Sequence, residues 1–148
     1  QLSKISSTEE KVGQKCKKRV DTTIAAILHL LKKQPDAAKQ KDSSGFTPLR
    51  QAISYGAPLE IVAALLKIWP DAAKEKVILG HTPLRMACME GAQFAVVDAL
   101  LQVWPDAAKE KDRRGRTPFH YACLRATPLE VIILLLNTWL SYTENRNE

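Results

Sequence analysis

The residues of this chain that could carry out chemistry are three histidines, three cysteines and a short run of arginines. Histidine and cysteine can ligate a metal ion or act in nucleophilic catalysis. However, His29, His81 and His120 fall on different expected elements, and no paired-cysteine motif, glycine-rich phosphate loop or nucleophile elbow accompanies them. The sequence therefore predicts a protein that is not an enzyme and that uses no metal and no cofactor.

The arginines within Arg113–Arg116 offer a different chemistry, the binding of anions. Guanidinium groups engage carboxylates or phosphates through charge-assisted hydrogen bonds. Basic residues are in excess at both ends of the chain: residues 1–41 hold ten Lys or Arg against four acidic residues, residues 42–112 hold seven against nine, and residues 113–148 hold five against three. The N-terminal cluster Lys11–Arg19 is either an anion-binding surface or the solvated side of a terminal cap.

A repeat of 35 residues determines which elements carry these side chains. The recurrences are Gly45–Leu49, Gly80–Leu84 and Gly115–Phe119 for one phrase, and Trp69–Lys74 and Trp104–Lys109 for another, with Pro35–Lys39 as a remnant of the second. A period of this length is typical of a stacked array in which each unit covers the apolar face of the next. We therefore expect one elongated repeat domain over residues 1–148, built of four units of which the first is degenerate.

Each unit is expected to contain two antiparallel helices. Thr47 and Pro48 begin the first helix of the second unit, because proline fits the first helical position, and Gly56 closes it. Pro58 reopens the chain for a second helix, which ends before Pro70 because a residue that precedes proline is biased out of the helical region. Apolar residues at helical spacing mark the buried stripes of the two helices: Leu49, Ala52, Ile53, Ile61, Val62, Leu65 and Leu66.

These residues resemble the ankyrin-repeat family. The resemblance rests on the Gly-x-Thr-Pro-Leu phrase, the alanine that follows it, and the Leu-Leu pair with a downstream aspartate, and it covers roughly residues 20–140. It implies an all-α solenoid of stacked helix-turn-helix units with short extended fingers between units. The period of 35 residues is longer than the family's usual 33. Arg50 and Arg85 replace the family's histidine, and Trp69 and Trp104 stand where a helix-ending glycine is common.

The cysteines and His120 are expected to be structural. An odd number of cysteines favours a reducing compartment, so we expect an intracellular protein, cytoplasmic or nuclear. Cys88 and Cys123 share one repeat position and should lie about a repeat apart, beyond the ~7 Å that a disulfide allows between α carbons, so both are expected to be small buried side chains. His120 resembles the family's histidine, which bonds backbone between neighbouring units. The apolar run Val131–Leu136 is far below the roughly 20 residues that span a bilayer.

The expected boundaries follow from the period. They are a loose N-terminus at 1–6, a degenerate capping repeat at 7–41, regular repeats at 42–76 and 77–111, a terminal repeat at 112–142 and a polar tail at 143–148. Ser7 followed by Glu10 indicates a capping box in the first unit. We expect Trp69 and Trp104 to be buried between neighbouring units, because they recur beside the same turn.

The last helix is expected to expose apolar side chains. Ile133 and Leu134 occupy positions that hold smaller or polar residues in the preceding units, although terminal units of solenoids normally turn polar on their outer face. A following segment, the tail, a second copy of the protein or the packing of the unit itself would cover them. Self-association through the C-terminal repeat is therefore one expectation.

The resemblance also implies where a partner binds. Ankyrin arrays bind macromolecules through their finger tips and the exposed positions of their first helices, which line the concave side. Carried over by motif position, the partner-binding residues are Ser43, Ser44, Phe46, Ser54, Tyr55, Ile78, Leu79, His81, Met89, Glu90, Arg113, Arg114, Arg116, Leu124 and Arg125. The middle finger has Val77 where its neighbours have Asp42 and Asp112, and its tip is apolar. That tip is either covered by a partner or the result of drift in one repeat.

Together these observations predict a non-catalytic protein-interaction module that binds an acidic, partly apolar segment of a partner on its concave side. The alternative is a protein that binds nucleic acid or an anionic surface through its terminal basic clusters. The central units are net acidic and the basic clusters lie at opposite ends of the chain instead of forming one track, which favours the first interpretation. The identity of the partner is not encoded in any motif of the chain.

Overall fold

The computed structural model describes residues 22–77 and 80–146 of the chain, with side chains as far as Ser141. Ile78 and Leu79, at the tip of the middle finger, lie outside the described residues. So do the expected loose N-terminus, the Ser7–Glu10 capping box and the Lys11–Arg19 cluster.

The chain divides into two compact units, residues 1–34 and residues 35–148. In the first unit, residues 22–33 form a helix. The second unit contains the regular repeats. A single domain over the whole chain, and the boundaries of the first repeat, remain predictions.

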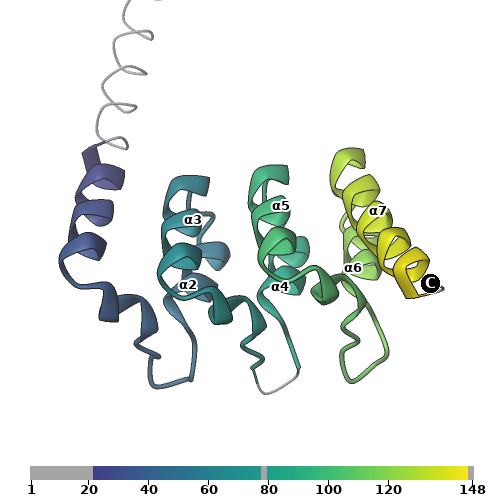
Figure 1. The fold of residues 1–148 in the computed structure, drawn as a ribbon, viewed down its shortest axis with the longest axis horizontal. Coiled ribbons are helices and arrows are strands. Elements are labelled where there is room, and N and C mark those ends of the chain that lie inside the picture. Colours follow the sequence, from purple (N-terminus) through teal and green to yellow (C-terminus); the bar gives the residue numbers. More distant parts are fainter. Residues whose placement is uncertain (1–21, 78–79, 147–148) are drawn as a thin grey trace, which may run out of the picture. The chain divides into compact units, whose positions relative to one another are not determined.

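Residues 35–77 and 80–146 form pairs of α-helices that alternate with short 3₁₀ helices (Figure 1). In chain order the elements are η1 (Pro35–Lys39), α2 (Pro48–Ser54), α3 (Leu59–Ile68), η2 (Pro70–Lys74), α4 (Pro83–Glu90), α5 (Phe94–Val103), η3 (Pro105–Lys109), α6 (Pro118–Leu124) and α7 (Leu129–Arg146). The described residues contain no strand. The predicted all-α fold is confirmed.

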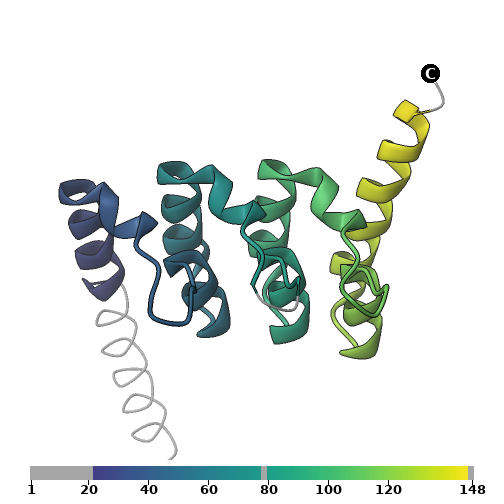
Figure 2. The same cartoon turned by 90° about the horizontal axis from the view of Figure 1, so that it is seen from below.

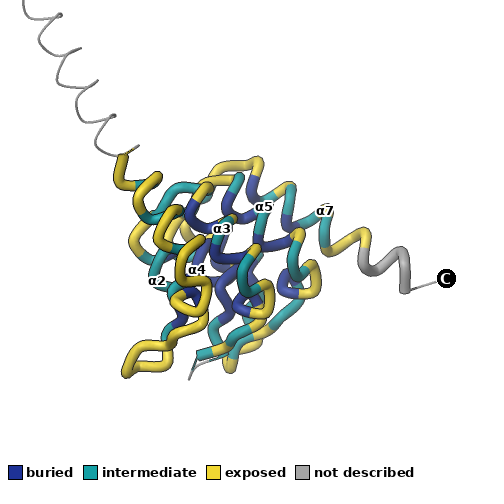
Figure 3. Tube along the Cα trace, turned by 60° about the vertical axis from the view of Figure 1, so that its left-hand side comes forward, coloured by how far each residue is buried: buried dark blue, intermediate teal, exposed yellow. Residues whose placement is uncertain are grey.

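The helices of this unit lie in two rows. The first helices α2, α4 and α6 pack side by side in one row, and the second helices α3, α5 and α7 form the other, as the two views in Figures 1 and 2 show. Each first helix also packs on the second helix of its own repeat. Figure 3 shows the buried residues concentrated on these stacked helices. The largest fully buried side chains include Leu49, Leu84, Val62, Val97, Leu100, Val131 and Leu135. The predicted stacking of helix-turn-helix units is thus confirmed.

Helices α2 and α4 begin, and helices α3 and α5 end, where the sequence predicts. The side chains of Thr47 and Thr82 accept hydrogen bonds from the amides of Arg50 and Arg85, both at 3.2 Å, and a proline occupies the first turn of each helix. Such caps satisfy amides that have no partner within the helix. Helices α3 and α5 end at tryptophans outside the helical region, with φ −136° at Trp69 and −142° at Trp104, and each tryptophan is followed by proline.

The turn after the first helix has a repeated left-handed residue. Gly56 has φ 70° and Gly91 has φ 67°, a conformation that glycine adopts without steric penalty. One period further on, the chain has Ala126 instead, and it keeps the positive value with φ 49°. The β-carbon of Ala126 is therefore held in a conformation that disfavours it.

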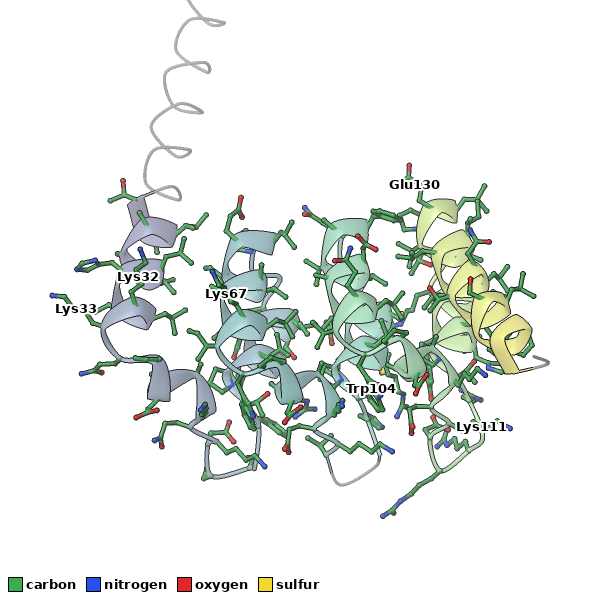
Figure 4. The ribbon with its side chains drawn as sticks, in the orientation of Figure 1. Lys32, Lys33, Lys67, Trp104, Lys111 and Glu130 are labelled. Atoms are coloured by element: carbon green, nitrogen blue, oxygen red, sulfur yellow. The ribbon has the colours of Figure 1, made fainter. Side chains whose placement is uncertain are left out.

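The Pro-Asp-Ala-Ala-Lys phrase forms a five-residue 3₁₀ helix at each of its three occurrences, where the sequence predicts only a turn. Five of its six alanines are buried, Ala38, Ala72, Ala73, Ala107 and Ala108, and Ala37 is exposed. The small side chains allow the short helix to pack against the first helix that follows. The prediction that Trp69 and Trp104 are buried is wrong, because both are half-buried and the alanines take the buried places beside them. Figure 4 shows Trp104 at the end of α5.

The terminal repeat differs from its predecessors. Helix α7 continues to Arg146, so the first residues of the expected polar tail are helical. Ile133 is exposed and Leu134 half-buried, and Trp139 and Leu140 are also exposed. Among the described residues, none of the helices combines the length and the apolar character needed to cross a bilayer. Self-association through this repeat stays a prediction.

The two cysteines of the second unit differ in burial, although we expected both to be buried. Cys88 on α4 is buried, and burial raises the pKa of its thiol to about 12. Cys123 on α6 is exposed. The reason is that α4 packs between α2 and α6, whereas among the described residues α6 has only α4 beside it in its row.

Candidate functional site

The finger that carries the arginine run is a tight turn closed on Asp112. The amide of Gly115 donates to the carbonyl of Asp112 at 3.0 Å, and Gly115 has φ 75°. The amides of Arg114 and Arg116 donate to Oδ1 of the Asp112 side chain at 2.8 and 2.9 Å. The aspartate therefore fixes the backbone from which the arginine side chains project.

The first finger has the same geometry around Asp42, and the middle finger keeps only part of it. Asp42 Oδ1 accepts from the amides of Ser44 and Phe46 at 2.8 and 2.9 Å. In the middle finger, the amide of Val77 donates to the carbonyl of His81, and the carbonyl of Val77 accepts from the amide of Gly80. Val77 has no carboxylate with which to anchor the turn.

Arg85 of α4 reaches into the next repeat and joins Asp112 to Tyr121 of α6. Only 8% of Arg85 is exposed. Its Nη2 atom donates to the Tyr121 hydroxyl at 2.6 Å and lies 3.1 Å from Oδ2 of Asp112. The Tyr121 hydroxyl donates to the same carboxylate oxygen, and the guanidinium carbon lies 4.3 Å from the centroid of the Tyr121 ring. The three side chains form a buried polar joint between successive repeats.

This joint keeps Asp112 ionised. The hydrogen bond from the Tyr121 hydroxyl, assisted by the amides of Arg116 and Arg114 and by the charge of Arg85, lowers the pKa of Asp112 to about 2, although burial opposes the shift. Both carboxylate oxygens are engaged. The hydrogen-bonding capacity of Arg85 is only partly satisfied, because its Nε and Nη1 atoms are buried and have no hydrogen-bond partner within the described part of the chain.

A pocket of about 390 Å³ opens above the joint. Its lining residues are His81, Arg85, Met89, Asp112, Arg113, Arg114, Arg116 and Tyr121. Four arginines thus face one aspartate whose oxygens are already bonded. We call this site the arginine pocket. Chemically it can hold an anion, because guanidinium groups in a partly enclosed site are strong donors to oxyanions.

His81 stands at this pocket as a neutral ring. Partial burial lowers the pKa of His81, and the charges of Arg85 and Arg50 lower it further, while Asp112 opposes them. An imidazole in this state has one nitrogen that donates and one that accepts a hydrogen bond. His81 therefore adds hydrogen-bonding capacity at neutral pH without adding charge.

The corresponding place one repeat earlier shares only the arginine, whose Nε and Nη1 atoms are likewise buried without a partner among the described residues. Arg50, at the position of Arg85, lies with its guanidinium carbon 3.5 Å from the centroid of the Phe46 ring, and its Nη2 atom is 3.9 Å from the sulfur of Met86. Val77 and Met86 stand where the next repeat has Asp112 and Tyr121. The arginine pocket is consequently not a property of every joint in the described array.

The predicted site residues are only partly brought together. The pocket unites His81, Met89, Arg113, Arg114 and Arg116. The other described members lie outside its lining: Ser43, Ser44, Phe46, Ser54, Tyr55, Glu90, Leu124 and Arg125. Tyr55 and Leu124 are nevertheless highly exposed, at 86% and 68%.

Sequence reasoning missed Arg85, Asp112 and Tyr121 as members of the site. A usable signal was present in the sequence. The residue that opens each finger and the residue nine positions after it are both polar in one repeat and both apolar in another. Oδ2 of Asp42 accepts from the side-chain amide of Gln51 at 2.8 Å, and Oδ2 of Asp112 accepts from the Tyr121 hydroxyl. In the middle repeat both positions are apolar. In the last repeat the same pairing also brings Asp112 and Tyr121 together where Arg85 of the preceding repeat meets them.

His120 does not bond between units as the resemblance implies. Its Nδ1 atom accepts from the amide of Thr117 at 3.0 Å, within its own repeat, and lies 2.9 Å from the Thr117 hydroxyl. The residue is exposed and caps α6. A second, larger groove of about 690 Å³ adjoins it, lined by residues of η3, α6, α7 and the start of the last finger. The described residues contain no cluster of His, Cys, Asp and Glu suited to a metal ion.

Two rows of stacked helices joined through short fingers define a helical repeat solenoid, a class of protein in which neighbouring units cover one another. The family model for ankyrin repeats, in three copies, matches residues 58–145. The chain therefore belongs to the ankyrin-repeat family, whose members are generally non-enzymatic modules for protein–protein interaction. A search of curated proteins finds no significant match.

Proposed function

We propose that this protein binds an acidic, partly apolar segment of a partner protein along the first-helix face, by which we mean α2, α4, α6 and the fingers that precede them. The arginine pocket carries the proposal. Its four arginines exceed the single aspartate, and the oxygens of that aspartate are already bonded within the joint. Carboxylates of a bound segment would supply the missing acceptors.

Apolar side chains beside the pocket supply the second part of the proposal. Met89 lines the pocket from the last turn of α4, and Leu124 occupies the same repeat position on α6. Tyr55 lies at the end of α2. Tyr55 and Leu124 are exposed and Met89 is half-buried, and binding is stabilised when a partner removes such large side chains from water. Ile78 and Leu79 are predicted from the sequence to add to this surface.

The experiment uses the full chain and a displayed library of random peptides, each about 15 residues long so that it can reach across neighbouring repeats. We expect selection to enrich peptides that combine Asp or Glu with aliphatic or aromatic residues. The triple variant Arg113→Glu, Arg114→Glu, Arg116→Glu should lose the selected peptides. A matched control, Lys39→Glu, Lys67→Glu, Lys74→Glu, makes the same change in net charge at exposed residues outside the pocket and should retain them. Figure 4 shows Lys67 on α3, away from the fingers.

Equal loss in both triple variants would mean that net charge, and not the pocket, governs binding. Generic nucleic acid bound more tightly than any selected peptide, with steep loss of affinity in salt, would support the alternative function instead.

A further inference from the structure

We propose that the arginine pocket receives a phosphoryl group, carried on a phosphorylated side chain of the bound segment. The inference rests on the proposed function and adds the chemistry that the pocket selects. Three observations support it: the surplus of donors, the fixed floor of the pocket and the contrast with the preceding joint.

The donors of the pocket outnumber what a carboxylate can accept. Within the described part of the chain, the guanidinium groups of Arg113 and Arg114 make no hydrogen bond or ion pair, and both residues are exposed. Beneath them the Nε and Nη1 atoms of Arg85 are buried without an acceptor among the described residues, but the same two atoms of Arg50 are too, so the surplus that distinguishes the pocket is that of Arg113 and Arg114. A phosphomonoester brings a charge of about −1.5 to −2 at neutral pH and three acceptor oxygens, whereas a carboxylate brings one charge and two oxygens.

The floor of the pocket is held in place before any ligand arrives. Asp112 anchors the finger through the amides of Arg114 and Arg116, and it is itself fixed by Tyr121 and Arg85. A site whose donors are already positioned loses less conformational entropy on binding. The long side chains of Arg113 and Arg114 are left to close over the ligand from the rim.

The preceding joint shows that the fold itself does not require this arrangement. Arg50 repeats Arg85, but the finger beside it has Val77 in place of Asp112, and the turn of its own finger carries Ser43 and Ser44 in place of two arginines. The arginines are therefore added to one finger only of those in residues 42–116. Solvation of the array does not explain that concentration, since single charges spread over the surface would serve it equally well.

The test is an NMR titration of the ¹⁵N-labelled full chain. The probes are N-acetyl-phosphoserine amide, N-acetyl-glutamate amide and inorganic phosphate. We expect the backbone amides of residues 113–116 and the Nε resonance of Arg85 to shift with the phosphoserine probe, at least about tenfold more tightly than with the glutamate probe, because one further charge-assisted bond has about this value. Inorganic phosphate should shift the same resonances with lower affinity.

The variant Arg113→Gln, Arg114→Gln should abolish the preference for phosphoserine while its circular dichroism spectrum stays that of the parent, because both residues are exposed. The control Lys67→Gln, Lys74→Gln should keep it. Equal affinity for the phosphoserine and glutamate probes would overturn the inference and leave the proposed function standing. Inorganic phosphate that binds as tightly as phosphoserine would overturn it too, by assigning the pocket to free phosphate. Shifts that avoid the pocket with every probe would contradict both proposals.

Discussion

Replacing Tyr121 by phenylalanine tests whether the buried joint between the last two repeats stabilises the array. The change removes one hydroxyl that accepts from Arg85 at 2.6 Å and donates to Asp112. The ring stays, and with it the contact to the Arg85 guanidinium at 4.3 Å. Tyr121 is only 8% exposed, so water does not readily replace the lost partner.

The expected loss of unfolding free energy follows from the two bonds. A hydrogen bond to a charged partner is worth about 1.5–3 kcal/mol net. Arg85 keeps Asp112 at 3.1 Å, so the ion pair partly compensates for the change. We therefore expect Tyr121→Phe to lower the free energy of unfolding by about 2–3 kcal/mol, the value of one such bond and not of two.

Urea denaturation measures this loss, followed both by far-ultraviolet circular dichroism and by tryptophan fluorescence. Two probes are needed because stacked repeats do not always unfold in a single step. The control is Tyr55→Phe, which removes the hydroxyl of a residue that is 86% exposed and should change stability by less than about 0.5 kcal/mol. An unchanged midpoint for Tyr121→Phe, or an equal loss in the control, would refute the stabilising role of the joint.

Three further predictions concern single positions. Asp112 has a pKa of about 2, below its ordinary 3.8, so its contribution to stability is complete above about pH 4 and is lost as the pH falls toward 2. A carbon-13 NMR titration of the Asp112 carboxyl should show this pKa, and Tyr121→Phe should raise it. Ala126→Gly should stabilise the protein by about 1 kcal/mol in thermal denaturation, because φ is positive at this residue. The control Ala63→Gly, in the helical interior of α3, should destabilise the protein by about 0.5–1 kcal/mol, and the same sign for both changes would contradict the argument. Trp104→Ala should lower the free energy of unfolding in urea by about 2 kcal/mol, less than the ~3–5 kcal/mol expected for a fully buried ring, because Trp104 is half-buried. A loss of ~3–5 kcal/mol would show that the ring is fully enclosed.

The fold was predictable because its signals are local and repeated. Thr47 and Pro48 cap a helix through contacts within one turn, and Pro70 ends another by steric exclusion, so neither depends on distant parts of the chain. The 3₁₀ helices were missed for the opposite reason. A five-residue segment is too short to show a period, and its alanines reveal their burial only once the neighbouring helices are in place.

The arginine pocket was predictable in part. Finger tips are exposed in any array of this kind, so Arg113 and Arg114 followed from motif position alone. Arg85 did not, because its partners lie 27 and 36 residues further on and the choice between a solvated and a buried guanidinium depends on what the next repeat offers. The burial expected for Cys123 by analogy with Cys88 fails for a related reason, because the row of first helices has no further member beyond α6 among the described residues.

The α2–α4 and α4–α6 interfaces differ in their polar contacts, and this difference affects the order in which the repeats unfold. In a one-dimensional stack, stability is the sum of the terms for single units and the terms for each interface between neighbours. The interface of α4 with α6 contains the Arg85–Asp112 ion pair, whereas at the interface of α2 with α4 the equivalent Arg50 contacts the sulfur of Met86 and has no carboxylate of the next finger to meet. Opening should therefore begin between α2 and α4, and amide hydrogens should exchange earlier in residues 42–76 than in residues 83–136. The last two repeats would then persist as a unit, with their anion-binding finger still in position, while the rest of the array frays.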